Sequence, residues 1–374
     1  MDNQYPYTTT PEERAARRAQ RIAARKERER ARRRKLLLRT LPVLALLVAA
    51  VGLLIWALGK KDGGGAARAF DAQQKMESPA GPEEIPSARP GSDPEPEQPY
   101  SAAATAGTAL LGEELPSQYA IVIDLTNNAI VAQKDAYAVI SPASMTKILT
   151  VLTAAEAISD ESQLDDTVVI DFDITDYCYV NGCSVAGFLR DESVSVRDLF
   201  YGTILPSGAD AALGLAKYIS GSQEAFVALM NQKAEELGLS DTAHFSNCVG
   251  LYDEENVCTV YDMAMILKAA MDNELCREVL TTKVYEIPAS EAHPEGMVLS
   301  NWFLRRIEDH MPSGVEILGA KTGFVNESGS CAASCAQDAE GNVYLCVTGN
   351  AYSSWRCVKD HAMLYELYAG GQAT

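Results

Sequence analysis

The sequence has 374 residues, of which 47% are hydrophobic and 22% are charged, a composition typical of a globular protein with one large domain or two medium ones. The net charge of −19 is divided unevenly, because residues 1–39 contain 13 Lys or Arg and 5 Asp or Glu, whereas residues 40–374 contain 19 basic and 46 acidic residues. A basic head and an acidic body argue against nucleic-acid binding by the body, and they indicate a membrane between the two.

The first 59 residues have the pattern of a membrane anchor with a basic flank. Residues 1–39 contain good helix formers without an apolar stripe, so we expect a basic cytoplasmic segment, with a nucleic-acid-binding tail as the weaker alternative. Residues 40–59 carry no charge and are long enough to cross a bilayer as a transmembrane helix. Because the Arg-rich flank precedes this single pass, the body would be extracellular at the cell membrane. A cleaved signal peptide is the alternative.

Residues 60–115 predict a spacer. Seven prolines fall between Pro79 and Pro99, among Glu, Asp, Ser and Gly. Such a segment buries too little apolar surface to offset the entropy of ordering, so we expect a disordered linker between the anchor and the next domain.

Residues 116–370 have a globular pattern. Strands are expected at 120–124 and 129–133, with Asn127 and Asn128 in the turn between them. Helices are expected at 147–158, 196–204, 209–219 and 223–237, followed by strands at 316–324, 330–337 and 343–348 and a last helix at 354–368. Strands at both ends of the domain with helices between them predict an α+β fold.

Nine cysteines all follow residue 177. If disulfides form, an odd number leaves at least one thiol unpaired, and Cys178 and Cys183 are near enough in sequence to pair. Reduced thiols in the core are equally compatible with this pattern. The sequence contains no HExxH, GxGxxG, P-loop or CxxC motif, so we expect neither a metal site nor a cofactor.

Ser144 and Lys147 form the first motif with a chemical meaning, in the segment SPASMTKILT. Residues at i and i+3 lie on one face of a helix. A serine hydroxyl is a poor nucleophile until a base removes its proton, and a buried lysine can be that base because burial lowers its pKa. The apolar run after Lys147 favours burial. SxxK alone is a weak signal, since a helix-capping serine with a surface lysine gives the same pattern.

Two further motifs follow in order. Ser207, in PSGAD, lies 63 residues after Ser144, and Lys321-Thr322-Gly323 begins another 114 residues later. A lysine and a hydroxyl on an edge strand suit a substrate carboxylate, and Gly323 allows a close approach of the substrate backbone. The three motifs in this order and spacing make coincidence improbable.

The segment 116–370 resembles the low-molecular-mass penicillin-binding proteins that act as D-alanyl-D-alanine carboxypeptidases, in the wider group that includes the serine β-lactamases. The resemblance extends beyond the three motifs to the surrounding segments PASMTK, MNQKAEELGLSDTAHFSNCVGL and KTGFVNESGSC. It implies a β-lactamase/transpeptidase-like fold, with an antiparallel sheet flanked by helices and a helical subdomain. The implied substrate is a peptidoglycan stem peptide ending in D-Ala-D-Ala, and β-lactams would be inhibitors.

The resemblance also implies a role for each matching residue. Ser144 would be acylated, Lys147 would be the general base, and Ser207 would relay a proton to the departing D-alanine. Lys321 and Thr322 would bind the terminal carboxylate, next to Gly323. The backbone N–H groups of Ser144 and Phe324 would form the oxyanion hole.

One departure from the family pattern affects the second motif, which normally reads SxN. Ala209 stands where the family has an asparagine that touches the base and the substrate peptide. Asp210 follows, but on a helix it would point elsewhere. This departure motivates the alternative of a penicillin-binding sensor or scaffold with little turnover. A serine β-lactamase is the other alternative, although no ExxxN-type match lies between the second and third motifs.

Overall fold

The computed structural model describes residues 100–369. The predicted basic segment 1–39, the predicted transmembrane helix at 40–59 and the first part of the predicted linker lie outside this range. Among the described residues, no helix combines the length and the apolarity needed to cross a bilayer.

A six-stranded sheet carries the fold, in the order β1-β3-β2-β10-β9-β8. Its strands are β1 (Ala103–Leu110), β2 (Tyr119–Asp124), β3 (Ala129–Lys134), β8 (Val315–Val325), β9 (Gly329–Asp338) and β10 (Val343–Ala351). All neighbouring pairs are antiparallel except β1 and β3, which are parallel. The sheet therefore unites the predicted strands from both ends of the domain, and the prediction of an α+β fold is confirmed.

Strand β1 corrects the predicted boundary of the linker. Residues 103–110 were expected to belong to a disordered spacer, but they pair with β3, with a break in register between Ala104 and Ala109. The strand consists of Ala, Thr, Gly and Leu and is largely exposed, so it joins the sheet through backbone hydrogen bonds without an apolar stripe. The folded domain therefore begins earlier than residue 116.

Both faces of the sheet are covered by helices. In β2, Ala120 and Val122 pack with Leu364 and Tyr365 of α10 (Ser354–Tyr368), whereas Ile121 belongs to the main core on the opposite face. This alternation follows from the period of two in a strand. Helix α7 (Val260–Asp272) contacts β2, β9 and β10 on the main-core side, and α9 (Trp302–Ile307) packs on β8 beside α10.

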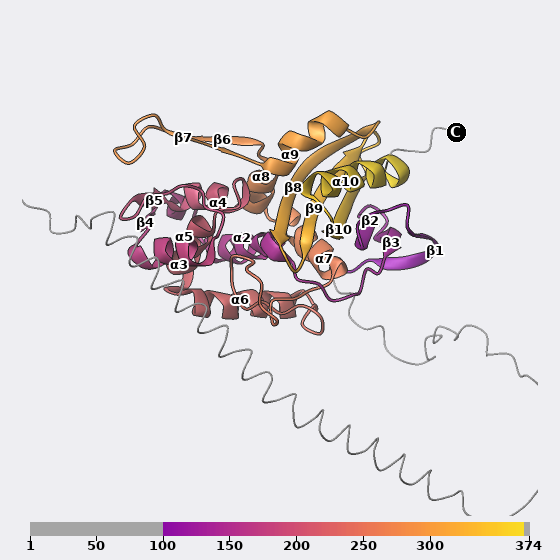
Figure 1. The fold of residues 1–374 in the computed structure, drawn as a ribbon, viewed down its shortest axis with the longest axis horizontal. Coiled ribbons are helices and arrows are strands. Elements are labelled where there is room, and N and C mark those ends of the chain that lie inside the picture. Colours follow the sequence, from indigo (N-terminus) through magenta and orange to yellow (C-terminus); the bar gives the residue numbers. More distant parts are fainter. Residues whose placement is uncertain (1–99, 370–374) are drawn as a thin grey trace, which may run out of the picture. The chain divides into compact units, whose positions relative to one another are not determined.

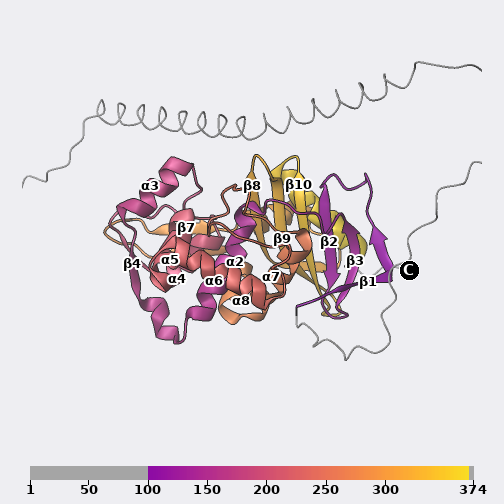
Figure 2. The same ribbon diagram turned by 90° about the horizontal axis from the view of Figure 1, so that it is seen from below.

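Most of the remaining helices form a second part of the domain (Figures 1 and 2). It consists of α3 (Phe172–Asn181), α4 (Val196–Ile204), α5 (Ala209–Ser220), α6 (Gln223–Glu236), the turn η2 (Glu161–Asp165) and the strand pair β4 (Thr167–Val169) with β5 (Ser193–Ser195). Helix α8 (Glu274–Thr281) packs mainly on α7 and β8, and the turn η3 (Glu308–His310) follows α9. Strands β6 (Val284–Ile287) and β7 (Met297–Ser300) form a separate two-stranded pair. Helix α2 (Thr146–Ala157) lies between the sheet and α3–α6, and ten of its twelve residues are buried. The junction at α2 is where the motifs meet.

The helices predicted at residues 147, 196, 209, 223 and 354 all form, within one residue of the expected starts. Ser222 caps α6 by accepting a hydrogen bond from the backbone N–H of Ala225, as its position before the apolar pattern predicts. The hairpin of β6 and β7 was not predicted. Figure 1 shows it projecting from the body beyond α8 and α9.

Candidate active site

Ser144 lies in a short 3-10 turn, η1 (Ala143–Met145), that leads directly into α2. Lys147 is in the first turn of α2, and its Nζ donates a hydrogen bond to the Ser144 Oγ across 3.1 Å. The same Nζ donates to the backbone carbonyl of Val249 across 2.6 Å. The predicted pair of nucleophile and base is therefore in contact, and the Val249 carbonyl orients the base.

Burial sets the charge state of the base. Lys147 is 2% exposed. Desolvation lowers the pKa of its ammonium from the ordinary value to about 8, and the nearby Cys183, Cys248 and Asp210 oppose this shift only in part. A lysine with a pKa near 8 is partly neutral at physiological pH, so it can accept the proton of Ser144.

Gly250 allows the loop that bears Val249 to reach the nucleophile turn. Its φ is +75°, and a Cβ at this position would lie 2.0 Å from the carbonyl oxygen of Ala143. Ala143 itself has a φ of 46°, in the left-handed region that non-glycine residues rarely adopt. The turn before Ser144 therefore has a strained backbone, and it packs against residue 250, where only glycine fits.

Ser207 and Lys321 form the second contact of the site. Ser207 lies between α4 and α5 with a φ of 63°, and the Nζ of Lys321 donates a hydrogen bond to its Oγ across 2.8 Å. Lys321 also donates to the backbone carbonyl of Thr322 across 2.7 Å. Desolvation, followed by repulsion from the Lys147 ammonium, holds the pKa of Lys321 well below its ordinary value. The second and third motifs thus meet beside the first.

The third motif lies on β8, at the edge of the sheet. A Cβ on Gly323 would lie 3.0 Å from the backbone nitrogen of Ser144 and 2.7 Å from the Cys331 sulfur. The sequence predicted that Gly323 allows the backbone of a substrate to approach. In the structure, Gly323 allows the backbone of the turn at Ser144 to approach. Thr322, Gly323 and Phe324 face the cleft, and the Phe324 ring is 63% exposed.

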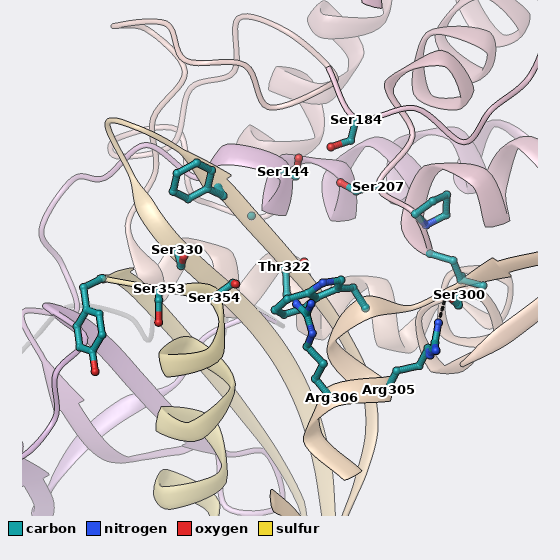
Figure 3. Close-up of a pocket in the computed structure, with 16 residues that line it drawn as sticks. Ser144, Ser184, Ser207, Ser300, Arg305, Arg306, Thr322, Ser330, Ser353 and Ser354 are labelled. Atoms are coloured by element: carbon teal, nitrogen blue, oxygen red, sulfur yellow. Dashed lines mark hydrogen bonds between the residues drawn. The ribbon is translucent and has the colours of Figure 1, made fainter. Parts of the chain in front are cut away.

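Ser144, Ser207 and the third motif open into one cleft of about 950 Å³. In Figure 3, Ser144, Ser184 and Ser207 gather on one side, and Arg306 reaches toward Thr322 from the other. The Arg306 guanidinium stacks on the Trp302 ring at 3.1 Å, and its Nη1 is buried without a hydrogen-bond partner. Two arginines, Arg305 and Arg306, line this cleft, and among the described residues no carboxylate does. The cleft therefore favours an anionic ligand.

The structure explains why Asp210 does not replace the missing asparagine. Its carboxylate accepts hydrogen bonds from the backbone N–H groups of Ala186, Gly187 and Phe188 at 2.7–3.3 Å. These contacts hold the carboxylate against the loop at residues 186–188, within reach of the charge on Lys147. Ala209 is buried, and its N–H donates to the carbonyl of Ser184. Both residues thus fix the loop that brings Ser184 into the cleft.

Sequence reasoning missed the Val249 carbonyl, Ser184, Trp302 and the two arginines. A backbone carbonyl has no sequence signature, and the other residues lie outside the three motifs. All four histidines fall within residues 100–369, and none lines the catalytic cleft. His361 is buried against Ser334 and Thr348, and desolvation lowers its pKa to about 3, so it is a neutral core residue. All nine cysteines are free thiols.

Comparison with known proteins agrees with this geometry. A profile of the D-alanyl-D-alanine carboxypeptidase family matches residues 103–351. The D-alanyl-D-alanine carboxypeptidase DacF of Bacillus subtilis is 32% identical over 231 residues, which are 62% of this chain and 56% of that protein. DacC of Escherichia coli is 38% identical over 152 residues, which are 40% of this chain and 38% of that protein. The chain thus matches about half the length, or less, of these curated relatives.

Solved structures are similar as well. The crystal structure of a Streptomyces DD-transpeptidase superimposes with a TM-score of 0.61 and 27% sequence identity, covering 68% of this chain and 97% of that chain. The carboxypeptidase DacD of Francisella tularensis has a TM-score of 0.59 and 25% identity, covering 68% of this chain and 70% of that chain. The fold is therefore that of the DD-peptidases, as the resemblance implied.

Proposed function

Because the chain belongs to the D-alanyl-D-alanine carboxypeptidase family, we propose that it is a serine-type hydrolase that removes the terminal D-alanine from peptidoglycan stem peptides. The observation that carries the proposal is the 3.1 Å contact between the Lys147 Nζ and the Ser144 Oγ, made by a lysine that is almost fully buried. No metal or cofactor is required, because the nucleophile and the base both come from the chain.

In the proposed acylation step, the Ser144 Oγ attacks the carbonyl carbon of the penultimate D-alanine and Lys147 takes the hydroxyl proton. The developing oxyanion accepts hydrogen bonds from the backbone N–H groups of Ser144 and Phe324. Each such donor typically lowers the barrier by about 3–4 kcal/mol. The C–N bond of the terminal residue then breaks, and Ser207 relays a proton to the departing amine. Water hydrolyses the ester on Ser144 in a second step.

Lys321 and Thr322 would bind the terminal carboxylate of the substrate. Lys321 already shares its ammonium with Ser207, so it links carboxylate binding to the proton relay. The uncompensated guanidinium of Arg306 in the same cleft adds positive charge for the same carboxylate. Gly323 keeps the strand close to Ser144. A β-lactam carries a comparable carboxylate beside a reactive carbonyl, so we expect it to acylate Ser144 and inhibit the enzyme.

The basic residues 1–39 and the uncharged residues 40–59 favour a single-pass anchor with a cytoplasmic N-terminus. We propose that the catalytic domain is extracellular, at the outer surface of the cell membrane. An extracellular location fits a wall-bound substrate.

The test uses the full chain in detergent micelles, a fluorescent penicillin and a peptide ending in D-Ala-D-Ala. We expect penicillin labelling and release of D-alanine, both abolished in Ser144→Ala. Ser354→Ala, which removes an exposed hydroxyl in the same cleft, is the matched control. Labelling without release of D-alanine would favour the sensor or scaffold that Ala209 suggested. Rapid β-lactam hydrolysis would favour the β-lactamase, and absence of labelling would overturn the assignment of Ser144.

A further inference from the structure

Two cysteines meet at the end of helix α3, directly before the loop that brings Ser184 into the cleft. Cys178 is buried in the last turn of α3, and Gly182 ends the helix with a φ of 64°. The N–H of Cys183 then donates a hydrogen bond back to the carbonyl of Cys178 across 3.0 Å. This pattern is a Schellman motif, which places the side chains of its first and sixth residues against each other. The two thiols therefore interact directly.

The two thiols differ in exposure and in acidity. All nine cysteines lie within residues 100–369, and Cys183 is the only one that is not buried. The Cys178 thiol stabilises a thiolate at Cys183 and lowers its pKa, and the Lys147 ammonium lowers it further, against the opposing effect of burial. The same contact, together with burial, raises the pKa of Cys178. An accessible thiol with a lowered pKa is the reactive kind, so Cys183 is the nucleophile of the pair.

Cys183 is joined to the catalytic centre by the residue that follows it. The Ser184 carbonyl accepts a hydrogen bond from the N–H of Ala209 across 2.8 Å, and Figure 3 shows Ser184 beside Ser144. A covalent change at Cys183 therefore acts one peptide bond away from the lining of the cleft. It also acts on the base, because burial lowers the pKa of Lys147 and a thiolate at Cys183 opposes this effect.

We propose that Cys178 and Cys183 are a redox-active pair that becomes a disulfide by exchange with an external disulfide. The Cys183 thiolate attacks one sulfur of the external disulfide, so a mixed disulfide forms and one external thiolate leaves. The Cys178 thiol then loses its proton to solvent and attacks the Cys183 sulfur, which forms the internal disulfide and releases the second external thiolate. Two thiols of the chain are oxidised, and one external disulfide is reduced to two thiols. The product fastens the loop of Ser184 to α3.

The proposed extracellular location provides the surroundings in which disulfides form and persist. The consequence for the acylation of Ser144 rests on the proposed function, whereas formation of the disulfide does not. The two parts of the inference are therefore tested by separate measurements on the same protein.

The first test detects the disulfide on the full chain in detergent micelles, without an enzyme assay. The reduced protein is incubated with oxidised glutathione, denatured, alkylated with iodoacetamide and digested with trypsin. Both cysteines fall on one tryptic peptide, residues 148–190. We expect this peptide to escape alkylation and to be lighter than its dithiol form by the mass of two hydrogen atoms. Reduction before alkylation is the control and should give the doubly alkylated peptide.

Two results of this first test would overturn the pairing. A peptide that is doubly alkylated after treatment with oxidised glutathione would show that the pair is not redox-active. A peptide that retains glutathione on Cys183 would show that Cys178 cannot reach its partner.

The second test measures penicillin labelling as a function of pH before and after oxidation. Because oxidation removes the thiolate beside Lys147, the profile should shift by about half a pH unit to lower pH, so labelling at pH 7 becomes about threefold faster. Cys183→Ser can neither ionise near neutral pH nor form the disulfide, so it should have the shifted profile in both redox states. Cys276→Ala, which removes a buried thiol of α8 outside the cleft, should respond to oxidation as the unaltered chain does.

An unchanged profile in a protein whose peptide carries the disulfide would overturn the link between the pair and the base. If penicillin labels the chain in neither redox state, the proposed function fails, and the mass of the peptide still decides whether the disulfide forms.

Discussion

The Lys321 Nζ donates a hydrogen bond to the Ser207 Oγ across 2.8 Å, and this contact joins two motifs that are 114 residues apart. Because the Lys321 Nζ is the donor in this contact, the Ser207 proton stays available to another group. Ser207 holds this position with a φ of 63°, which is costly for a residue with a side chain. In the proposed mechanism Ser207 is the proton relay, so its position would be maintained at the expense of backbone strain.

Two variants of Ser207 separate the relay from the strain. Ser207→Ala and Ser207→Gly both lack the hydroxyl, so we expect each to slow acylation by penicillin about 100-fold, the usual range for loss of general acid–base catalysis. Only glycine relieves the positive φ. The free energy of unfolding of the glycine variant should therefore exceed that of the alanine variant by about 1 kcal/mol. Denaturant unfolding measures this difference, and a glycine variant no more stable than the alanine variant would contradict the strain.

The acylation rate should depend on pH through Lys147. Burial lowers the pKa of this ammonium to about 8, and only the neutral amine accepts the Ser144 proton. Raising the pH through 8 deprotonates the base, so the acylation rate should rise about tenfold per pH unit below that value and level off above it. Stopped-flow labelling with a fluorescent penicillin between pH 6 and 9.5 measures the profile. A rate that falls as the pH rises through 8 would exclude Lys147 as the base.

Lys147→Met should abolish acylation with little change in thermal stability. The substitution removes a buried cation, which is favourable, but it leaves the Val249 carbonyl without its donor, at a cost of about 1–3 kcal/mol. Because these effects have opposite signs, we expect the two unfolding temperatures to lie within a few degrees of each other. A large fall in unfolding temperature would mean that Lys147 supports the fold as well as the reaction. Calorimetry together with penicillin labelling separates these outcomes.

Much of the fold was predictable from the sequence because its core elements have strong periodic patterns. Helix α2 follows from an unbroken apolar run, and β2 and β3 from short apolar segments on either side of an Asn-Asn turn. Strand β1 was missed because small residues such as Ala103 and Ala104 pair with β3 without forming an apolar pattern in the sequence. The hairpin of β6 and β7 was missed because its four-residue strands are too short to show a pattern.

The candidate site also contains features that could be predicted from the sequence and features that could not. The residues of the three motifs are brought together, as the family resemblance implied, but no residue pattern indicates the Val249 carbonyl that orients Lys147. Gly250 was not singled out either, because its importance depends on a contact with Ala143, which is 107 positions away in the chain. Long-range contacts of the backbone leave no local pattern in a single sequence.

Asp210→Asn should weaken both the fold and the activity. The buried carboxylate accepts hydrogen bonds from three successive N–H groups at residues 186–188, and an amide can present only one oxygen to them. We expect a loss of about 2 kcal/mol in the free energy of unfolding and slower turnover, because this loop carries Ser184 into the cleft. Asp241→Asn, at an exposed site outside the cleft, is the control. Unchanged unfolding in the Asp210 variant would show that the loop is held by other contacts.

Gly250→Ala tests whether the nucleophile turn is positioned by the loop beside it. The new Cβ would lie 2.0 Å from the Ala143 carbonyl oxygen, so the turn, the loop or both must move. We expect a loss of at least about 2 kcal/mol in stability and acylation at least about 10-fold slower, since the Val249 carbonyl would no longer hold Lys147 against Ser144.

Gly314→Ala is a close control for this variant. Gly314 has a φ of +69°, similar to that of Gly250, but a Cβ there would meet no atom within 4 Å. It should therefore incur the cost of the positive φ, about 1 kcal/mol, without affecting acylation. Denaturant unfolding and penicillin labelling of both variants measure the two effects separately. Equal acylation rates in the two variants would show that the contact between Gly250 and Ala143 does not position Ser144.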